Sequence, residues 1–150
     1  KNVRSCVPVE DVTLVAGLLR MLESVITAEL LIDPQKVHTT FVFCAIWAFG
    51  SALTVADDGT DNRAVFNEWW RAQFKTIRLP ARDQVFDYWL DPNSCKFEAW
   101  KQCPVYKHIE FDSRSMTMAE VTVPTTESAS VTFWLQNMVK IKDKKVVLHC

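Results

Sequence analysis

Residues 41–49 read Phe-Val-Phe-Cys-Ala-Ile-Trp-Ala-Phe, and this apolar run lies inside a longer stretch, 37–56, that has no Asp, Glu, Lys or Arg. About 20 apolar residues can cross a bilayer as a helix, so length alone would nominate a membrane span. Polar and small residues dilute both ends, however, and no Lys/Arg cluster flanks the stretch. These diluting residues are Thr39, Thr40, Gly50, Ser51 and Thr54. The stretch therefore predicts a fully buried core helix over 40–53.

The segment before this helix has the pattern of an amphipathic helix over 10–31. Its apolar residues recur every three or four positions, which places them on one helical face. They are Leu14, Leu18, Leu22, Val25 and Ile26. Asp33-Pro34 is predicted to end the helix, because the residue before proline avoids helical geometry.

A third helix is predicted over 61–75, with Asp61 as its N-cap. Its apolar stripe consists of Val65, Phe66, Trp69, Trp70 and Phe74. Asp57, Asp58 and Asp61 could suggest calcium, but their spacing does not match the twelve-residue calcium-binding loop and no closing Glu is present. A solvated turn is favoured for 57–60.

The pattern changes after residues 76–84, which contain Pro80 and mark a candidate boundary. Two short aromatic runs, 85–90 and 96–100, are separated by Asp-Pro-Asn-Ser-Cys and predict a β-hairpin. Alternation over 105–111 predicts a third strand. The chain therefore divides into a helical first half and a second half that begins with strands, which predicts an α+β fold.

The last thirty residues resemble the approach to a phosphate-binding loop. Val121-Thr122-Val123-Pro124-Thr125 precedes a predicted helix over 127–141, a charged turn over 142–145 and a buried strand over 146–148. In P-loop proteins such a strand leads into a glycine-rich loop. No such loop follows here, so we expect the chain to be part of a larger protein. Val123, Pro124 and Thr125 could line an adenine pocket, or could simply be a strand end followed by a helix cap.

Composition excludes some classes of function. The net charge is −1 and neither sign is clustered, so the basic face that nucleic-acid binding requires is missing. The cysteines are odd in number and form no Cys-x-x-Cys pair, which argues against a zinc site or a full disulfide set and favours reduced thiols in a cytosolic protein. They are Cys6, Cys44, Cys95, Cys103 and Cys150.

No constellation of residues supports catalysis by this segment alone. His38, His108 and His149 are isolated in the sequence, and Glu98 and Glu110 look like ordinary strand positions. With three glycines, the chain cannot form a glycine-rich loop, and no nucleophile elbow is present. We therefore expect neither catalytic nor metal-ligating residues.

The tryptophans leave two interpretations open. Core packing is favoured for Trp69, whereas Trp70 and the hairpin residues Trp89 and Trp100 could belong either to the core or to an interface hot spot.

Taken in order, several segments resemble the axonemal dynein heavy chain, an AAA+ motor. The resemblance rests on residues 41–50, on Phe-Asn-Glu-Trp-Trp at 66–70 and Phe-Lys-Thr at 74–76, on Val-Phe-Asp-Tyr-Trp-Leu-Asp-Pro at 85–92, and on Lys-Phe-Glu-Ala-Trp at 96–100. Residues 121–125 and 145–150 continue it. The ordered set covers nearly the whole chain.

The resemblance implies the helical small subdomain of the second AAA+ module over 1–78, an inter-module connection over 79–120, and the first helix and strand of the α/β third module over 121–150. It implies ATP or ADP with Mg²⁺ in the parent chain and no nucleotide on this segment alone, with Val123, Pro124 and Thr125 on the adenine side of the third site. Trp70, Trp89 and Trp100 would pack between modules.

The implied partners are the neighbouring modules of the same heavy chain, microtubules, and dynein intermediate and light chains, without nucleic acid or membrane. The implied location is the cytoplasm, cytoskeleton and ciliary or flagellar axoneme. Two alternatives remain: an independent interaction module that uses the aromatic hairpin, and a small membrane protein.

Overall fold

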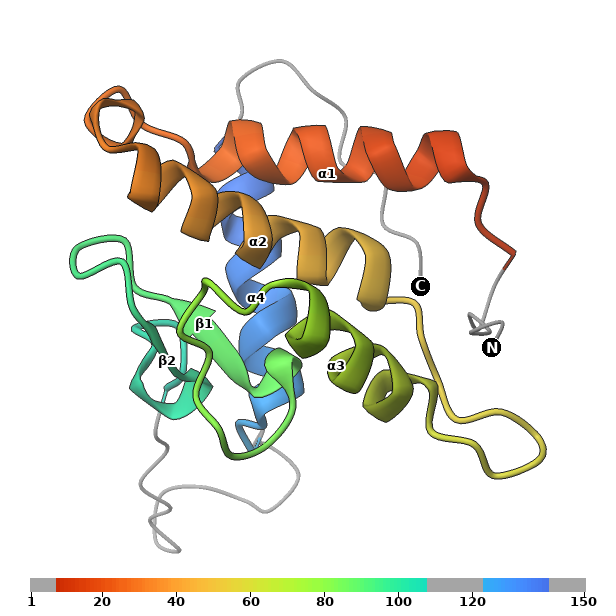
Figure 1. Ribbon diagram of the computed structural model, residues 1–150. Coiled ribbons are helices and arrows are strands. Elements are labelled where there is room, and N and C mark those ends of the chain that lie inside the picture. Colours follow the sequence, from red (N-terminus) through yellow and green to blue (C-terminus); the bar gives the residue numbers. More distant parts are fainter. Residues whose placement is uncertain (1–7, 108–122, 141–150) are drawn as a thin grey trace, which may run out of the picture.

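A computed structural model describes residues 8–107 and 123–140 of the chain. The described part contains four α-helices and one two-stranded hairpin, and the hairpin lies on the opposite side of α2 from α1 (Figure 1). The helices are α1 (Asp11–Val25), α2 (Pro34–Gly50), α3 (Asn62–Gln73) and α4 (Thr126–Val139). The strands are β1 (Tyr88–Leu90) and β2 (Phe97–Ala99), and three single-turn 3-10 helices are η1 (Leu30–Ile32), η2 (Val85–Asp87) and η3 (Trp100–Gln102).

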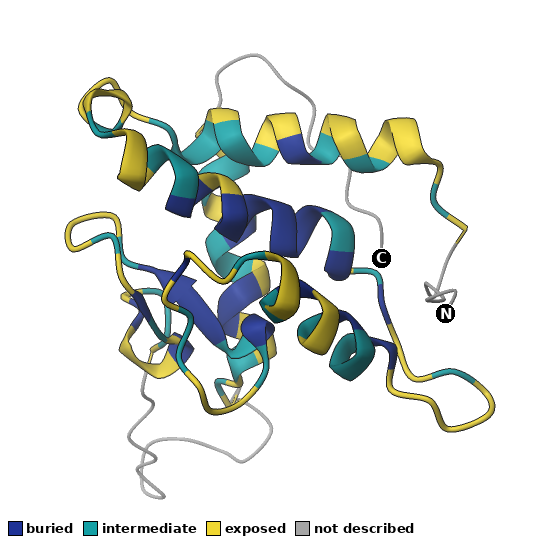
Figure 2. Cartoon of the chain, viewed as in Figure 1, coloured by how far each residue is buried: buried dark blue, intermediate teal, exposed yellow. Residues whose placement is uncertain are grey.

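The central element is α2, the buried helix that the sequence predicts, although it covers Pro34–Gly50 instead of 40–53. It packs against α1 on one side and against α3, η2 and β1 on the other, while α4 contacts α1 and η3 (Figure 1). Residues 42–48 are all buried, and Figure 2 shows α2 as the main buried helix. None of the described helices has the length and apolar character needed to cross a membrane.

The boundary between α1 and α2 differs from the prediction. Helix α1 stops at Val25, six residues early, because the β-branched run Val25-Ile26-Thr27 disfavours helix and Ile26 adopts extended backbone. Asp33-Pro34 begins α2 instead of ending α1. The Asp33 carboxylate accepts hydrogen bonds from the Gln35 and Lys36 N–H groups at 2.9 and 3.4 Å, and Pro34 occupies the first turn, where its missing N–H has no cost.

The other predicted elements agree more closely. Asp61 caps α3, with hydrogen bonds from the Arg63 and Ala64 N–H groups. The hairpin is antiparallel, with Trp89 opposite Glu98, but each strand has only three residues because the flanking residues form η2 and η3. Helix α4 lies close to the predicted 127–141.

Some predictions fall partly or wholly outside the described residues. Residues 105–107 contain no strand, and the remainder of the predicted third strand is not described. The turn over 142–145, the strand over 146–148, and several individual predictions also lie outside. These are Cys6, His108, Glu110, His149 and Cys150.

Aromatic side chains from both halves of the chain form a shared core. Phe43 of α2 stacks on Trp134 of α4 with ring centroids 5.2 Å apart. Trp47 meets Trp100 edge-to-face at 5.7 Å, and Phe133 meets Trp100 at 5.6 Å. The helical first half, the hairpin and α4 therefore share one hydrophobic core.

Candidate functional site at the junction of the helical half and α4

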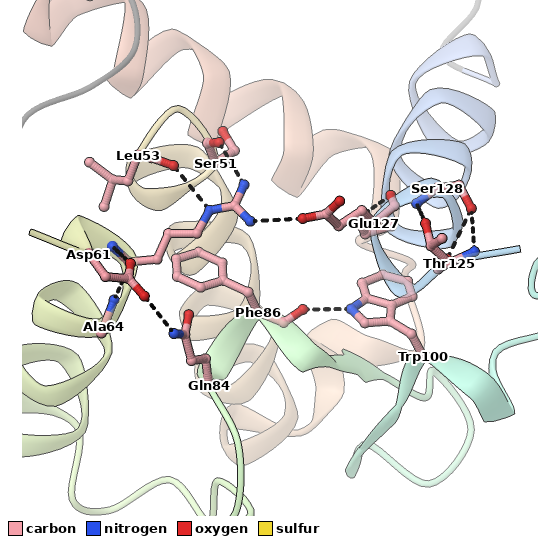
Figure 3. Close-up of polar contacts among 12 residues, drawn as sticks. Ser51, Leu53, Asp61, Ala64, Gln84, Phe86, Trp100, Thr125, Glu127 and Ser128 are labelled. Carbon is pink, nitrogen blue, oxygen red and sulfur yellow. Dashed lines mark hydrogen bonds and ion pairs between the residues drawn. The ribbon is translucent and has the colours of Figure 1, made fainter. Parts of the chain in front are cut away.

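A cleft of about 900 Å³ lies where the two halves meet, and we call it the junction cleft. Four segments line it: the end of α2 with the loop after it, the start of α3, the segment leading into η2, and the first turns of α4 (Figure 3). Its lining residues are Trp47, Ser51, Leu53, Thr54, Val55, Asp61, Arg63, Asp83, Gln84, Phe86, Asp87, Thr125, Thr126, Glu127, Ser130 and Val131.

Arg63 connects the segments across this cleft. Its Nε donates to the Leu53 carbonyl at 3.1 Å, and an Nη donates to the Ser51 carbonyl at 3.4 Å. Its other Nη lies 3.6 Å from the Glu127 carboxylate on α4, and the guanidinium carbon is 5.4 Å from the centroid of the Phe86 ring. Figure 3 marks the hydrogen bonds to the carbonyls of Leu53 and Ser51 and the ion pair with Glu127 as dashed lines. One side chain thus contacts the end of α2, η2 and α4.

Local hydrogen bonds explain why Arg63 occupies this position. It is the second residue of α3, so the Asp61 cap fixes its backbone. The other Asp61 oxygen accepts a hydrogen bond from the Gln84 side chain at 3.4 Å, and the Gln84 N–H donates to Asp87 at 2.8 Å. The start of α3 and the η2 segment are therefore held together on one wall of the cleft.

A second arginine holds the η2 segment against α3. Arg71 donates to the carbonyls of Pro80 and Asp83 at 2.7 and 3.2 Å, and to the Asn67 side chain at 3.0 Å. The same Asn67 oxygen accepts a hydrogen bond from the Val85 N–H. These hydrogen bonds hold residues 80–84, the second half of the predicted boundary segment 76–84, against α3.

The opposite wall of the cleft is the start of α4. Thr125 and Ser128 form a capping box with reciprocal hydrogen bonds of 3.0 and 2.9 Å. Of the residues predicted for the adenine side, Thr125 lines the cleft, Pro124 is half-buried and its carbonyl accepts a hydrogen bond from the Tyr106 hydroxyl at 3.1 Å, and Val123 is exposed. Their assignment to nucleotide stays a prediction.

The structure shows the burial of the tryptophans for which the sequence left core packing and an interface both open. Trp70, Trp89 and Trp100 are 3, 5 and 0% exposed, and the Trp100 indole donates to the Phe86 carbonyl at 2.8 Å. They belong to the core of the described part of the chain, where Trp89 and Trp100 contact Phe133 of α4, and their role in packing between modules stays a prediction. The aromatic hairpin surface of the interaction-module alternative is buried with them.

Trp69, for which core packing was favoured, is instead 54% exposed. Phe66 and Trp70 are four residues apart on the buried face of α3, so the residue adjacent to Trp70 is turned away from that face.

The described cysteines are free thiols: Cys44, Cys95 and Cys103. Burial raises the pKa of the Cys44 thiol from 9.0 to about 12, and burial also raises the pKa values of Cys95 and Cys103. Within residues 8–107 and 123–140, no group of three His, Cys, Asp or Glu side chains is arranged to hold a metal ion. His38 lies half-buried on α2.

Sequence reasoning missed Arg63, Glu127 and the carbonyls of Ser51 and Leu53. A partial signal was available, since Arg63 follows the predicted cap Asp61 by two residues and Glu127 opens a predicted helix. Their meeting across 64 residues depends on how α4 docks, and a local pattern does not carry that information.

Comparisons with known proteins agree with the fold. Residues 1–102 match the family model described as "Dynein heavy chain AAA lid domain". Human dynein axonemal heavy chain 9 is 34% identical over 138 residues, which is 90% of this chain. The flagellar outer-arm dynein alpha chain of Chlamydomonas reinhardtii is 32% identical over 145 residues (95% of the chain), and the ciliary dynein beta chain of Tripneustes gratilla is 35% identical over 136 residues (88%).

The chain spans about 3% of the length of each of these relatives. Their names describe axonemal, flagellar and ciliary dyneins, and the matched region includes α1 to α3 and the hairpin. On this evidence the chain belongs to the dynein heavy chain family, as a segment that contains its AAA lid domain.

Proposed function

We propose that this segment connects two successive AAA+ modules of an axonemal dynein heavy chain and transmits nucleotide-dependent motion between them. In this proposal, helices α1 to α3 are the lid of the second AAA+ module, and α4 is the first helix of the third module. The parent chain is then an ATP-hydrolysing microtubule motor that uses Mg²⁺, works with intermediate and light chains, and acts in ciliary or flagellar beating. Relatives named as axonemal, flagellar outer-arm and ciliary dyneins support its location in the cytoskeleton and axoneme.

The observation that carries this proposal is the core shared between α2 and α4. Phe43 stacks on Trp134 at 5.2 Å, and Trp134 also contacts Trp47 at 6.4 Å. Packed interiors are dense and transmit displacement instead of absorbing it. A lid that moves with its own module therefore carries α4 with it, and the next module receives a rigid-body displacement.

The test uses the complete heavy chain with Trp134→Phe, which loosens this core without removing the ring. The matched control is Trp69→Phe, because Trp69 is exposed. We expect Trp134→Phe to reduce microtubule gliding velocity several-fold more than the control, while basal ATP hydrolysis persists in both. Equal gliding velocities for the two variants would argue against a relay through this junction.

A second expectation concerns the isolated segment. Because the proposal gives it a mechanical role, the purified 150-residue chain should hydrolyse ATP no faster than a buffer blank. Turnover that is retained through further purification and abolished by unfolding would contradict the proposal.

A further inference from the structure

We propose that residues 80–84, which we call the strap, release from α3 as a unit while the aromatic core stays packed. The strap lies between α3 and η2 in the chain. Every residue of the strap and of its contacts is described, and the release does not depend on which AAA+ modules the chain connects.

The strap is held by side chains instead of by its own backbone. Within the described structure, no backbone–backbone hydrogen bond involves residues 80–83. Three of the four carbonyls in that stretch accept hydrogen bonds from two side chains, those of Arg71 and Tyr88. Residues 81–83 are also exposed. Exposed segments with few backbone hydrogen bonds are the parts of a protein that open locally, at a lower free energy than the core.

Arg71 of α3 holds both ends of the strap. Its two Nη atoms donate to the carbonyls of Pro80 and Asp83 at 2.7 and 3.2 Å, and its Nε donates to Asn67 at 3.0 Å. The same Asn67 oxygen accepts a hydrogen bond at 3.0 Å from the Val85 N–H, the first amide after the strap. Rotation of one guanidinium therefore frees both carbonyls and removes the support of the Val85 acceptor.

Asp83 favours release because its backbone conformation in the closed strap is unfavourable. Its φ is +58°, in the left-handed region, which Asp tolerates better than most residues but still at a cost. The Tyr88 hydroxyl lies 2.6 Å from the Arg82 carbonyl and 3.3 Å from the Asp83 carboxylate. Because a hydroxyl has one hydrogen, the two acceptors share it. The strap thus stays closed only while side chains of α3 and β1 both hold it.

Buried anchors on both sides limit the release to the strap. Ile77, before it, is 7% exposed, and Val85 and Phe86, after it, are 1 and 6% exposed. The Phe86 carbonyl accepts the Trp100 indole hydrogen bond at 2.8 Å, and the Phe86 ring lies 5.6 Å from the Phe66 ring of α3. Removing these side chains from the core costs more than breaking the strap contacts. Helix α3 and η2 therefore remain joined through their aromatic rings while the strap opens.

The release gives the junction a flexible connection beside a rigid one. Arg71 belongs to α3 and Tyr88 to β1, so a shift between the lid helices and the hairpin strains both sets of strap contacts. Gln84, the last residue of the strap, reaches Asp61 on the wall of the junction cleft. Opening of the strap therefore loosens that wall without disturbing the rings behind it.

The experiment is hydrogen–deuterium exchange of the complete heavy chain, followed by mass spectrometry. The reporters are the amides of Gln84 and Val85, which donate to side-chain acceptors at 2.8 and 3.0 Å, and the reference is the buried stretch 42–48 of α2. We expect the reporters to exchange at least about tenfold faster than the reference. Urea below the unfolding midpoint should accelerate the reference but not the reporters, because release exposes little surface.

Arg71→Lys tests the contact that closes the strap. Lysine has a single nitrogen and cannot bridge two carbonyls and Asn67, so exchange at the reporters should rise by about tenfold, the effect of losing a hydrogen bond from a charged donor. Exchange in α2 should not change. The matched control is Arg78→Lys, because Arg78 is exposed and no hydrogen bond or ion pair of the described structure involves its side chain. Tyr88→Phe keeps the ring, removes the hydroxyl, and should raise reporter exchange by about two- to fivefold.

Any of four results would overturn the release. The reporters could exchange as slowly as α2 in the unsubstituted chain, a comparison that needs no variant to fold. Arg71→Lys could accelerate the reporters and α2 equally, which would mean that the strap opens only with the core. Neither Arg71→Lys nor Tyr88→Phe could change reporter exchange. Finally, Arg78→Lys could accelerate the reporters as much as Arg71→Lys does.

Discussion

Gly50 is the one of the three glycines at which the core leaves no room for a side chain. A Cβ atom added there would lie 2.5 Å from Cζ of Phe86 and 3.1 Å from Cε1 of Phe66. Glycine at the end of α2 therefore allows two rings to approach the helix backbone closely, and no sequence pattern indicates this.

We expect Gly50→Ala to lower the free energy of unfolding by about 1–3 kcal/mol, because the rings must move to admit the methyl group. Gly17→Ala is the matched control. It lies in α1 with no atom within 4 Å of the added Cβ, and should stabilise the chain by about 0.5–1 kcal/mol through helix propensity. Urea unfolding of the two variants measures both values, and effects of the same sign would contradict the packing argument.

Arg63 and Glu127 are partners of unequal importance. Arg63→Ala removes hydrogen bonds to two carbonyls and the contact with Phe86, so we expect it to destabilise the chain by about 1–2 kcal/mol. Glu127 is 81% exposed, and Glu127→Gln should change stability by less than about 0.5 kcal/mol. If Glu127→Gln cost as much as Arg63→Ala, the ion pair, and not the carbonyl contacts, would hold the junction.

Cys44 predicts a specific dependence of stability on pH. Burial raises its folded pKa from 9.0 to about 12, so above pH 9 the unfolded state loses a proton that the folded state keeps. The contribution of the buried neutral thiol to the free energy of unfolding is fully present below pH 9 and is lost as pH rises towards 12. The free energy of unfolding then falls with a limiting slope of about 1.4 kcal/mol per pH unit. Burial also raises the pKa of Tyr88, which acts in the same direction.

Comparison with Cys44→Ala separates the effect of the thiol on the pH dependence of stability from the effects of Tyr88 and the lysines. In urea unfolding between pH 8 and 10.5, the stability of the unsubstituted chain should fall more steeply than that of the variant. Parallel curves would mean that the thiol ionises as readily in the folded chain as in the unfolded one.

At the scale of elements, the predictable features are those set by local sequence. The apolar run of α2, the Asp61 cap of α3 and the loop of the hairpin depend on neighbouring residues, and each appears where the pattern places it. The predicted end of α1 was wrong. The apolar periodicity of this segment continues past Val25, but the β-branched run that begins there disfavours helix. Asp33-Pro34 was assigned to the wrong helix, because the same dipeptide can end one helix or cap the next.

The caps of α2 and α3 give a prediction at this scale. Asp33→Ala removes the side-chain cap of α2 and should cost about 1 kcal/mol. Asp61→Ala should cost more, because Asp61 caps α3 and also accepts a hydrogen bond from Gln84. Urea unfolding should show a larger loss of stability for Asp61→Ala than for Asp33→Ala. The reverse order would show that the Gln84 contact contributes little.

At the scale of the whole molecule, the candidate site was the least predictable part. The junction cleft brings together residues 51–55, 61–63, 83–87 and 125–131, and their proximity depends on how α4 packs against α2. Local sequence does not indicate the burial of Trp89 and Trp100, because it depends on their contacts with Phe133 of α4. Tertiary packing decided which aromatics are buried.

This dependence on α4 leads to a prediction about two tryptophans of equal size. Trp134 is 6% exposed and contacts Phe43, Trp47 and Phe133, whereas Trp69 is 54% exposed. We expect Trp134→Ala to lower the free energy of unfolding by about 3–5 kcal/mol, the cost of removing a buried tryptophan side chain, and Trp69→Ala to cost much less.

Thermal unfolding followed by circular dichroism tests this difference. If α4 and the lid helices form one cooperative unit, Trp134→Ala should lower the midpoint of a single transition. If it instead leaves that midpoint in place and adds a separate low-temperature transition, α4 unfolds independently. The lid would then keep its fold without α4, and the shared core could not transmit motion from one module to the next.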